Sequence, residues 1–200
     1  MKLTKIIIFI SSINWIFGLD LSGLNTNQEW TTLQNNNIII KTTDYLGFPI
    51  CNAETTLPYP LKTISAIIEN VNEYPSVFLR VTESKSLEND VVHIVLDMPF
   101  PFAGRDYIIK YNKHKFGSEW TFNFSAVEHK DAPLNKGHVR LIHAAGEWKL
   151  TAMNEYETIV TYMWNGELLG DFPTWALERA WKTQGNEIME WLNDALKKIK

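Results

Sequence analysis

Apolar and polar residues alternate along much of the middle of the chain. In the segment 120–126, apolar residues hold every even position, and Thr, Asn or Ser holds every odd one. A period of two predicts a β-strand with one buried face. Alternating or β-branched segments predict further strands at 38–43, 49–56, 77–84, 91–98, 105–111, 139–143, 146–150 and 157–164. Because short polar turns join most of these segments, we expect an antiparallel sheet that buries one face.

Two segments show helical spacing instead. In 60–71, apolar residues recur three or four positions apart, and Pro60 suits the first turn of a helix. A longer helix is predicted from Asp171, a candidate N-cap, to the end of the chain, with Gly185 as a possible bend. Its apolar stripe consists of Leu177, Trp181, Ile188, Leu192, Leu196 and Ile199. The weakly patterned segment 19–37 predicts at most a short helix.

A sheet must bury its apolar face against another layer. The large apolar partner in this chain is the C-terminal helix. We therefore predict an α+β fold in which a curved antiparallel sheet wraps around a long C-terminal helix. Aromatic residues make up 12% of the chain and include eight tryptophans, which is enough bulk for a packed core or for the lining of a large pocket.

The first 18 residues are typical of a signal peptide. Lys2 and Lys5 precede a mostly apolar stretch, 6–17, and Gly18 is a small residue at a suitable cleavage point. Residues 19–200 would then form a single domain with a formal charge of −6, from 17 basic and 23 acidic residues, instead of −4. We expect export to a periplasm or out of the cell. An uncleaved segment would instead anchor the protein to a membrane or form an apolar N-terminal helix.

Charge and composition argue against several functions. No run of Lys or Arg exceeds two residues and the net charge is negative, which disfavours nucleic acid as a partner. The lone cysteine, Cys51, permits neither an internal disulfide nor a thiolate metal site, and we expect it to be a small buried hydrophobe. The five histidines have no metal-binding spacing, and no serine-nucleophile or phosphate-loop motif is present. We expect no cofactor, no metal and no catalytic residues of these kinds.

Residues 99–107, Pro-Phe-Pro-Phe-Ala-Gly-Arg-Asp-Tyr, form the most informative segment. Pro99 and Pro101 cannot lie inside a central strand, so they mark a rigid corner before the strand that Arg105 and Asp106 open. This arrangement resembles the Pro-x-Pro-x-x-x-Arg-Asp-aromatic signature of START (StAR-related lipid-transfer) domains, which belong to the helix-grip or Bet v 1-like superfamily. Other segments resemble START sequences in order and spacing, so that the resemblance extends over 30–198: they are 139–150, 158–170 and 172–175.

The resemblance implies a helix-grip fold with an interior hydrophobic tunnel that holds one lipid or other apolar molecule. The inward face of the sheet and the C-terminal helix would line this tunnel. The ligand-binding candidates are Ile109, Tyr111, Trp120, Phe122, Phe124, Leu141, His143, Trp175, Leu177, Trp181 and Ile188. For each of them, core packing is an equal expectation. Arg105 and Asp106 are expected to form a structural ion pair at the corner.

Position 111 departs from the START pattern. The sterol-carrying members have a cavity arginine six residues beyond the motif arginine, where this chain has Tyr111. A neutral phenol can hydrogen-bond a polar head group, but it cannot form an ion pair with a phosphate.

The segment 112–118 is a basic loop with one aromatic residue and one glycine. The resemblance implies that this loop lies beside the terminal helix and gates the tunnel. Lys113, Lys115 and Phe116 are therefore candidates for transient contact with an anionic membrane surface. A solvated hairpin turn is the alternative.

The resulting prediction is a monomeric domain that binds one lipid or hydrophobic ligand for transfer or sensing, without chemistry. An alternative is a cyclase- or hydrolase-like enzyme on the same fold, with His143 and Tyr111 in its pocket. A third possibility is an exported protein-interaction domain whose interior is filled by side chains.

Overall fold

The structure is a computed structural model that describes residues 18–21, 23–24, 28–88 and 90–199. The predicted signal peptide lies outside these residues, except for Gly18. The strands are β1 (Thr31–Asn35), β2 (Ile39–Tyr45), β3 (Phe48–Leu57), β4 (Val81–Glu88), β5 (Val91–Leu96), β6 (Gly104–Phe116), β7 (Glu119–Ala126), β8 (His138–Arg140), β9 (Ala145–Ala152) and β10 (Thr158–Asn165). The helices are α1 (Leu61–Glu69), α2 (Tyr74–Val77) and α3 (Leu177–Lys198), with 3₁₀ turns at Val71–Glu73 and Thr174–Ala176.

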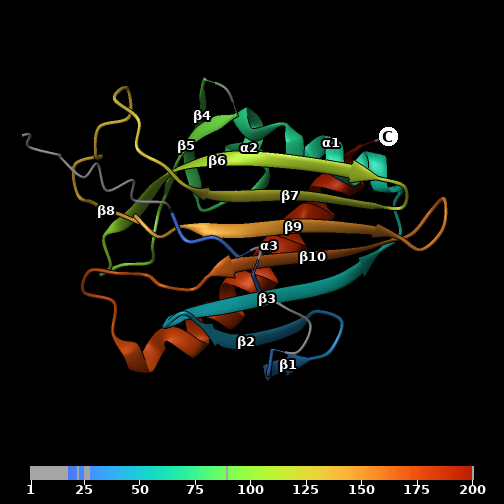
Figure 1. Cartoon of the computed structure of the whole chain (residues 1–200), viewed down its shortest axis with the longest axis horizontal. Helices are drawn as coiled ribbons and strands as arrows, with labels where there is room; N and C mark the ends of the chain where they lie inside the picture. The colour runs from blue at the N-terminus through green and yellow to red at the C-terminus, as the bar shows by residue number, and fades with distance from the viewer. Residues whose placement is uncertain (1–17, 22, 25–27, 89, 200) are drawn as a thin grey trace, which may run out of the picture.

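Within the described residues, the strands form one ten-stranded sheet (Figure 1). Its order is β1-β2-β3-β10-β9-β7-β6-β5-β4, and neighbours along this path run antiparallel. The strand β8 stands off the path and pairs in parallel with the start of β6. Pairing of β3 with β10 joins residues about a hundred positions apart, from Leu57 opposite Thr158 to Ile50 opposite Asn165.

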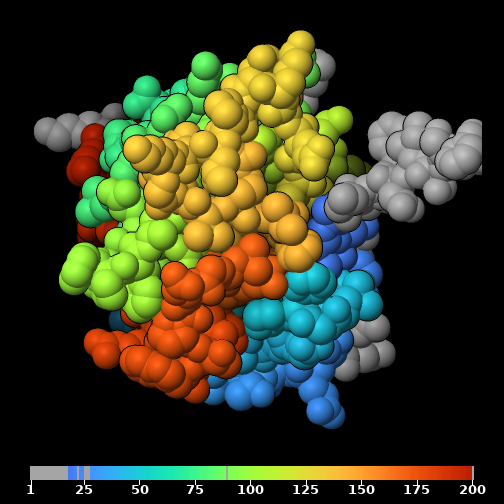
Figure 2. Space-filling model, turned by 90° about the vertical axis from the view of Figure 1, so that its left-hand side faces the viewer, coloured from blue at the N-terminus to red at the C-terminus, as the bar shows by residue number. Residues whose placement is uncertain are grey.

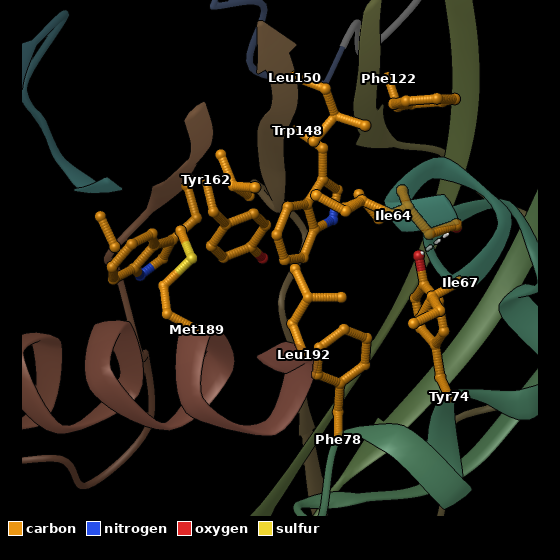
Figure 3. Packing of buried hydrophobic residues seen from close by; sticks show 14 of the residues in the cluster. Ile64, Ile67, Tyr74, Phe78, Phe122, Trp148, Leu150, Tyr162, Met189 and Leu192 are labelled. Carbon is orange, nitrogen blue, oxygen red and sulfur yellow. Dashed lines mark hydrogen bonds between the residues drawn. The ribbon is translucent and has the colours of Figure 1, made fainter. Parts of the chain in front are cut away.

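The sheet curves around α3, which crosses its concave face (Figure 1). Met189, Leu192 and Leu196 are buried between the helix and the sheet. Figure 3 shows Met189 and Leu192 pointing from α3 toward Trp148 and Tyr162 on the sheet. The predicted α+β architecture, a curved antiparallel sheet around a long C-terminal helix, is confirmed.

Gly185 lies where α3 approaches β2 and β3. A Cβ atom at this position would lie 3.0 Å from Ile40 Cδ1 and 3.3 Å from Ala53 Cβ, and both of those residues are fully buried. The structure therefore explains the glycine by the close approach of the helix to the sheet, where the sequence predicted a bend.

Two elements differ from their predictions because of how the strands pair with one another. The segment 19–37 contains the edge strand β1 instead of a short helix, because Thr31 and Thr32 pair with Thr42 and Lys41 of β2. The predicted strand 139–143 ends at Arg140, because β8 loses contact with β6 beyond Asp106.

The start of the C-terminal helix also differs from its prediction. Asp171 is not its N-cap, because Pro173 has an extended backbone, with ψ of 132°, that interrupts the helix. A 3₁₀ turn follows, and α3 begins at Leu177 without a side-chain cap. At the other end, Ile199 lies beyond the helix and is exposed, so it does not continue the buried stripe.

Leu19 and Leu21 pack against the outer side of the sheet. Leu19 and Leu21 are buried and form a small apolar cluster with Ile50 and Ala145. A domain that begins at residue 19, as predicted, would therefore keep these contacts.

Candidate functional site: a cavity beneath the C-terminal helix

A cavity of about 570 Å³ lies between α3 and the concave face of the sheet. This volume falls in the range of about 300–1,000 Å³ that is typical of small-molecule sites. Residues of β5, β6, β7, β9 and β10 form one wall and α3 forms another. The segments 74–81, 98–102, 141–144 and 165–176 contribute further lining residues. Most of the lining side chains are aliphatic or aromatic. The predicted interior space therefore exists, in contrast to a filled interior.

The inner end of the cavity is an aromatic wall. The ring centroids of Trp148 and Tyr162 are 4.3 Å apart, and those of Tyr162 and Trp164 are 5.2 Å apart. Phe78 stacks on Trp148 with centroids 6.0 Å apart. Figure 3 shows Tyr162 and Trp148 side by side on the sheet, with Phe78 approaching from below. All four residues are buried, so flat apolar surface faces the interior.

Four tyrosines bring hydroxyl groups to this inner end: Tyr74, Tyr107, Tyr111 and Tyr162. The Tyr74 hydroxyl donates to Ile68 O at 2.7 Å and lies 3.4 Å from the Tyr111 hydroxyl. The hydroxyls of Tyr107 and Tyr162 have no hydrogen-bond partner in the part of the chain that the structure describes. Burial raises the pKa of Tyr162 well above its ordinary value, and the phenols of Tyr107 and Tyr111 raise it further. These phenols are therefore neutral at physiological pH.

The charged side chains along the cavity are mostly paired. Arg80 binds Glu187 of α3 through two hydrogen bonds of 2.6 Å each. His143 Nδ1 lies 2.8 Å from a carboxylate oxygen of Glu167. Arg179 lines the cavity from the first half of α3 and is exposed.

The outer end of the cavity is bordered by two exposed aromatic residues. Phe100, between β5 and β6, is 97% exposed, and Trp175, just before α3, is 84% exposed. Next to them, the rings of Phe102 and Phe172 pack with centroids 4.6 Å apart and join the two segments. Figure 2 views this end directly, with the yellow-green segment around residue 100 beside the orange-red segment around residue 170. We call this end, defined by Phe100, Phe102, Phe172 and Trp175, the aromatic mouth.

Arg105 and Asp106 hold this end of the sheet together, but not by pairing with each other as predicted. The side chains of successive strand residues point to opposite faces. Arg105 is buried and donates to the carbonyl oxygens of Leu168 and Leu169, at 2.6 and 3.0 Å, and to that of Ala103. It thereby fixes the segment that leads from β10 to α3.

Asp106 lies on the opposite face and is fully buried. It accepts two hydrogen bonds from Arg140, at 2.8 and 2.6 Å, and lies 3.1 Å from His93 Nε2. Burial of the carboxyl raises its pKa, but the hydrogen bonds and charges of Arg140 and His93 outweigh this effect and leave the pKa below its ordinary value. The motif prolines lie in the adjoining corner, where Pro99 lines the cavity and the Phe100–Pro101 bond is cis.

The cavity brings together seven of the predicted ligand-binding residues: Ile109, Tyr111, Phe124, Leu141, His143, Trp175 and Ile188. Ile109, Tyr111 and Phe124 belong to its inner end, whereas Trp175 borders the mouth. Their contact with a ligand stays a prediction.

Four predicted residues lie outside this lining. Trp120 packs under Lys115, whose Nζ lies 4.6 Å from the ring centroid. Phe122 is buried and borders a smaller cavity of about 200 Å³. Trp181 donates from Nε1 to Gly166 O at 2.8 Å and so faces the β10–α3 segment. Leu177, at the start of α3, is half-buried.

Several lining residues were missing from the prediction. Trp148 lies between Glu147 and Lys149 in β9, so the period of two could have found it. Tyr162 lies between Thr161 and Met163 in β10, where both faces carry apolar residues and the period is weaker. Tyr74 and Phe78 lie in and just after the single turn of α2, where no periodic signal exists. Arg80 and Glu187 become recognisable as a pair only once α3 lies across the sheet.

The segment 112–118 lies at the end of the sheet opposite the aromatic mouth (Figure 1). Most of it extends β6, and Gly117 and Ser118 form the turn to β7. Lys113 pairs with Asp90 at 3.0 Å and Lys115 with Glu69 of α1 at 2.7 Å, while Phe116 is 88% exposed. No residue of this segment lines the main cavity, but Lys113 lines the smaller one, which shares Tyr111 with it. Gating by this segment therefore stays a prediction. Its contact with a membrane stays a prediction.

Two further observations concern the described residues as a whole. They contain no group of three or more His, Cys, Asp or Glu side chains placed to hold a metal ion. Among them, no helix combines the length and the apolar character needed to cross a membrane.

Known sequences give limited information about this chain. No protein-family model matches it. An uncharacterized protein of Pseudomonas aeruginosa is 28% identical over 125 residues, which are 60% of this chain and 62% of that protein. The chain thus matches less than two thirds of the length of this curated relative.

Solved structures give a clearer result. The STAR-related lipid transfer protein of Xanthomonas axonopodis is similar with a TM-score of 0.74 at 21% identity, over 84% of this chain and 99% of that one. Human StAR-related lipid transfer protein 5 is similar with a TM-score of 0.76 at 14% identity, over 86% of this chain and 88% of that one. The Zhui aromatase/cyclase of a Streptomyces species is similar with a TM-score of 0.52 at 15% identity, over 76% of this chain and 95% of that one. The similar proteins thus include both lipid-transfer proteins and an enzyme.

Proposed function

We propose that this chain, which has a START-like fold, binds a single lipid or other hydrophobic ligand in the cavity beneath α3 and carries or senses it without chemistry. The observation that carries the proposal is the 570 Å³ cavity with its aromatic inner end. Burial of apolar ligand surface contributes about 25 cal/mol per Å², so an apolar molecule gains more from this lining than water does. The names of the similar lipid-transfer proteins support the same class of ligand.

Mass spectrometry tests this proposal. The purified protein is measured under native conditions, and an organic extract of it is analysed for lipids. We expect a stoichiometric bound lipid, or uptake of one from a mixed lipid extract. A clean mass of the protein alone, without uptake from the extract, would contradict carriage.

Two variants locate the binding site. Ile109→Trp fills the inner end, where Ile109 is 1% exposed, and Ala180→Trp fills the cavity from α3. Both should lose ligand uptake, although Ile109→Trp carries an overpacking cost of about 1–3 kcal/mol. Leu134→Trp, at an exposed apolar position outside the lining, is the control and should bind like the wild type. Uptake that survives both fillings would place the ligand elsewhere.

The mouth suggests how a ligand enters. Phe100 and Trp175 present apolar area to solvent beside the opening, and aromatic side chains of this kind enter the boundary region of a bilayer. We propose that the protein touches a membrane transiently with the aromatic mouth, and that its two segments separate to admit the lipid.

The cellular setting is also a proposal. We propose that the protein is exported and that cleavage after Gly18 leaves a mature chain that starts at Leu19. We also propose that this mature chain is a monomer. Intact mass of the protein from a membrane-enclosed or secreted fraction, together with its mass in solution, measures both properties. Retention of Met1, or a stable dimer, would contradict them.

A second candidate function rests on His143 and Glu167. A carboxylate that orients a histidine at the edge of a pocket is a recurring arrangement for general acid–base chemistry. The alternative is therefore a cyclase- or hydrolase-like enzyme with His143 as the base. His143→Phe should leave uptake of the extracted lipid intact under the carrier proposal. Conversion of that lipid by the wild type, abolished in His143→Phe, would favour the enzyme.

A further inference from the structure

The polar groups at the inner end of the cavity narrow the class of ligand, on the condition that the proposed binding function holds. Tyr107 of β6 and Tyr162 of β10 line this end, and neither hydroxyl has a hydrogen-bond partner among the described residues. The other two phenols, Tyr74 and Tyr111, are already engaged with Ile68 O and with each other. Tyr162 is buried and Tyr107 is half-buried, but neither hydroxyl is sealed within the protein, so both are accessible from the cavity. An apolar ligand that covered these hydroxyls would leave them without a partner at a cost in free energy, which an oxygen atom of the ligand would avoid.

The same end lacks a charge that could balance an anion. Among the described residues, two arginines line the cavity. Arg80 donates two hydrogen bonds to Glu187, and Arg179 is exposed on the first half of α3. His143 is engaged with Glu167. A phosphate at the inner end would thus lose its hydration without gaining an ion pair within the described part of the chain, which is strongly unfavourable. A cationic head group would meet the same obstacle, because Glu187 and Glu167 are already paired.

We infer that the ligand is an uncharged lipid whose hydroxyl or carbonyl oxygen enters first and hydrogen-bonds Tyr107 and Tyr162, with its apolar body toward the aromatic mouth. A phenol both donates and accepts, so it serves either kind of oxygen. Burial raises the pKa of the Tyr107 phenol, so this donor stays protonated. The aromatic wall of Trp148, Tyr162 and Trp164 supplies flat surface for the part of the ligand next to its head.

A matched pair of probes tests the inference. 1-Dodecanol and dodecyl phosphate carry the same chain, and only the second carries a charge. Binding of each below its critical aggregation concentration is measured by calorimetry or by the change in tryptophan fluorescence. We expect the alcohol to bind and the phosphate to bind at least tenfold more weakly.

Phenylalanine variants test the two hydroxyls without changing the rings. Tyr107→Phe and Tyr162→Phe should each weaken binding of 1-dodecanol by about five- to tenfold, and the double variant more. Tyr156→Phe, at a tyrosine that is 73% exposed and outside the lining, is the matched control and should leave binding unchanged. Thermal unfolding of each variant verifies that it is folded.

The outcomes separate the inference from the proposed function. If dodecyl phosphate binds as tightly as the alcohol, or if the double variant binds the alcohol as the wild type does, the inference is wrong while lipid binding stands. If the wild type binds neither probe and takes up no lipid from an extract, the proposed function fails, and the inference fails with it.

Discussion

Arg80 and Glu187 meet across the cavity, 107 positions apart in the sequence, through two hydrogen bonds of 2.6 Å. Arg80 directly precedes β4, the last strand of the sheet, and Glu187 lies in the middle of α3. The pair therefore ties the helix to the far edge of the sheet. Hydrogen bonding to Glu187 raises the pKa of Arg80, more than burial lowers it, so the ion pair persists at any pH at which Glu187 is ionised.

Loss of this pair should loosen α3 without unfolding the protein. Glu187→Gln should lower the free energy of unfolding by less than about 1 kcal/mol, because both side chains are partly exposed, at 33% and 23%. Exchange of bound lipid should nevertheless become several-fold faster, measured by competition in a stopped-flow instrument. Glu190→Gln, at an exposed position of the same helix, is the control. Equal exchange rates in Glu187→Gln and the wild type would show that the pair does not restrain the helix.

The position of the aromatic mouth predicts where the protein meets a membrane. The double variant Phe100→Ser and Trp175→Ser should slow transfer of a fluorescent lipid from anionic vesicles by tenfold or more, because two large apolar side chains no longer enter the bilayer. Its affinity for lipid presented in detergent should change little.

Phe116→Ser provides the matched control for the mouth. Phe116 is similarly exposed, at 88% against 97% for Phe100, but lies at the opposite end of the sheet. If Phe116→Ser slows transfer and the mouth variant does not, the segment 112–118 is the membrane contact after all.

The buried carboxylate of Asp106 predicts a specific loss of stability in acid. Because its pKa is lower in the folded protein than in the unfolded chain, its contribution is fully present above the unfolded value of about 3.9 and disappears as the pH falls through the folded value. Asp106→Asn should cost about 1–3 kcal/mol at pH 7, because Arg140, whose side chain is only 23% exposed, loses its hydrogen bonds to the carboxylate. The variant should also lose less stability than the wild type when the pH is lowered below 4.

Urea unfolding at pH 7 and at pH 3 measures both effects. Asp97→Asn, at an exposed carboxylate beyond β5, should behave like the wild type at each pH. An Asp106→Asn variant with wild-type stability at pH 7 would contradict a structural role for the network of Asp106, Arg140 and His93.

Cys51 should be chemically inert in the folded protein. Burial raises the pKa of its thiol to about 12, an effect that the hydrogen bond with Thr42 only partly offsets, and the residue is fully buried. The reactive thiolate is therefore nearly absent at pH 8. Ellman's reagent should label the thiol only after denaturation. Prompt labelling of the native protein would mean that β3 opens or that α3 leaves the sheet.

The strands and the long helix could be predicted because their signals are local. Alternation between 120 and 126 arises from a strand with one buried face, and β7 occupies 119–126. The spacing of Leu192 and Leu196 likewise reflects one buried stripe of α3. The corner at Pro99 and Pro101 was also recognisable, because proline restricts its own backbone wherever it occurs.

Other features could not be predicted, because they depend on residues far apart in sequence. Two of the carbonyl groups that Arg105 binds, those of Leu168 and Leu169, are more than sixty positions away, and Asp106 pairs with Arg140 instead of its neighbour. Backbone carbonyls exist at every residue, so no sequence pattern marks these two distant carbonyls as partners of Arg105. The pairing of β3 with β10 could not be predicted either, because it depends on the arrangement of all the strands in the sheet.

The sequence by itself thus determined which segments become strands and helix, the START-like character of the fold, and the apolar faces that must be buried, since backbone restriction and side-chain periodicity act within a few residues. Only the tertiary structure decided that these faces leave a cavity, that Tyr107 and Tyr162 both line it, and that the exposed Phe100 and Trp175 border it whereas Phe116 does not. A cavity is the space left when curved layers pack. Its place and chemistry follow from distances between residues on different strands, which no local pattern encodes.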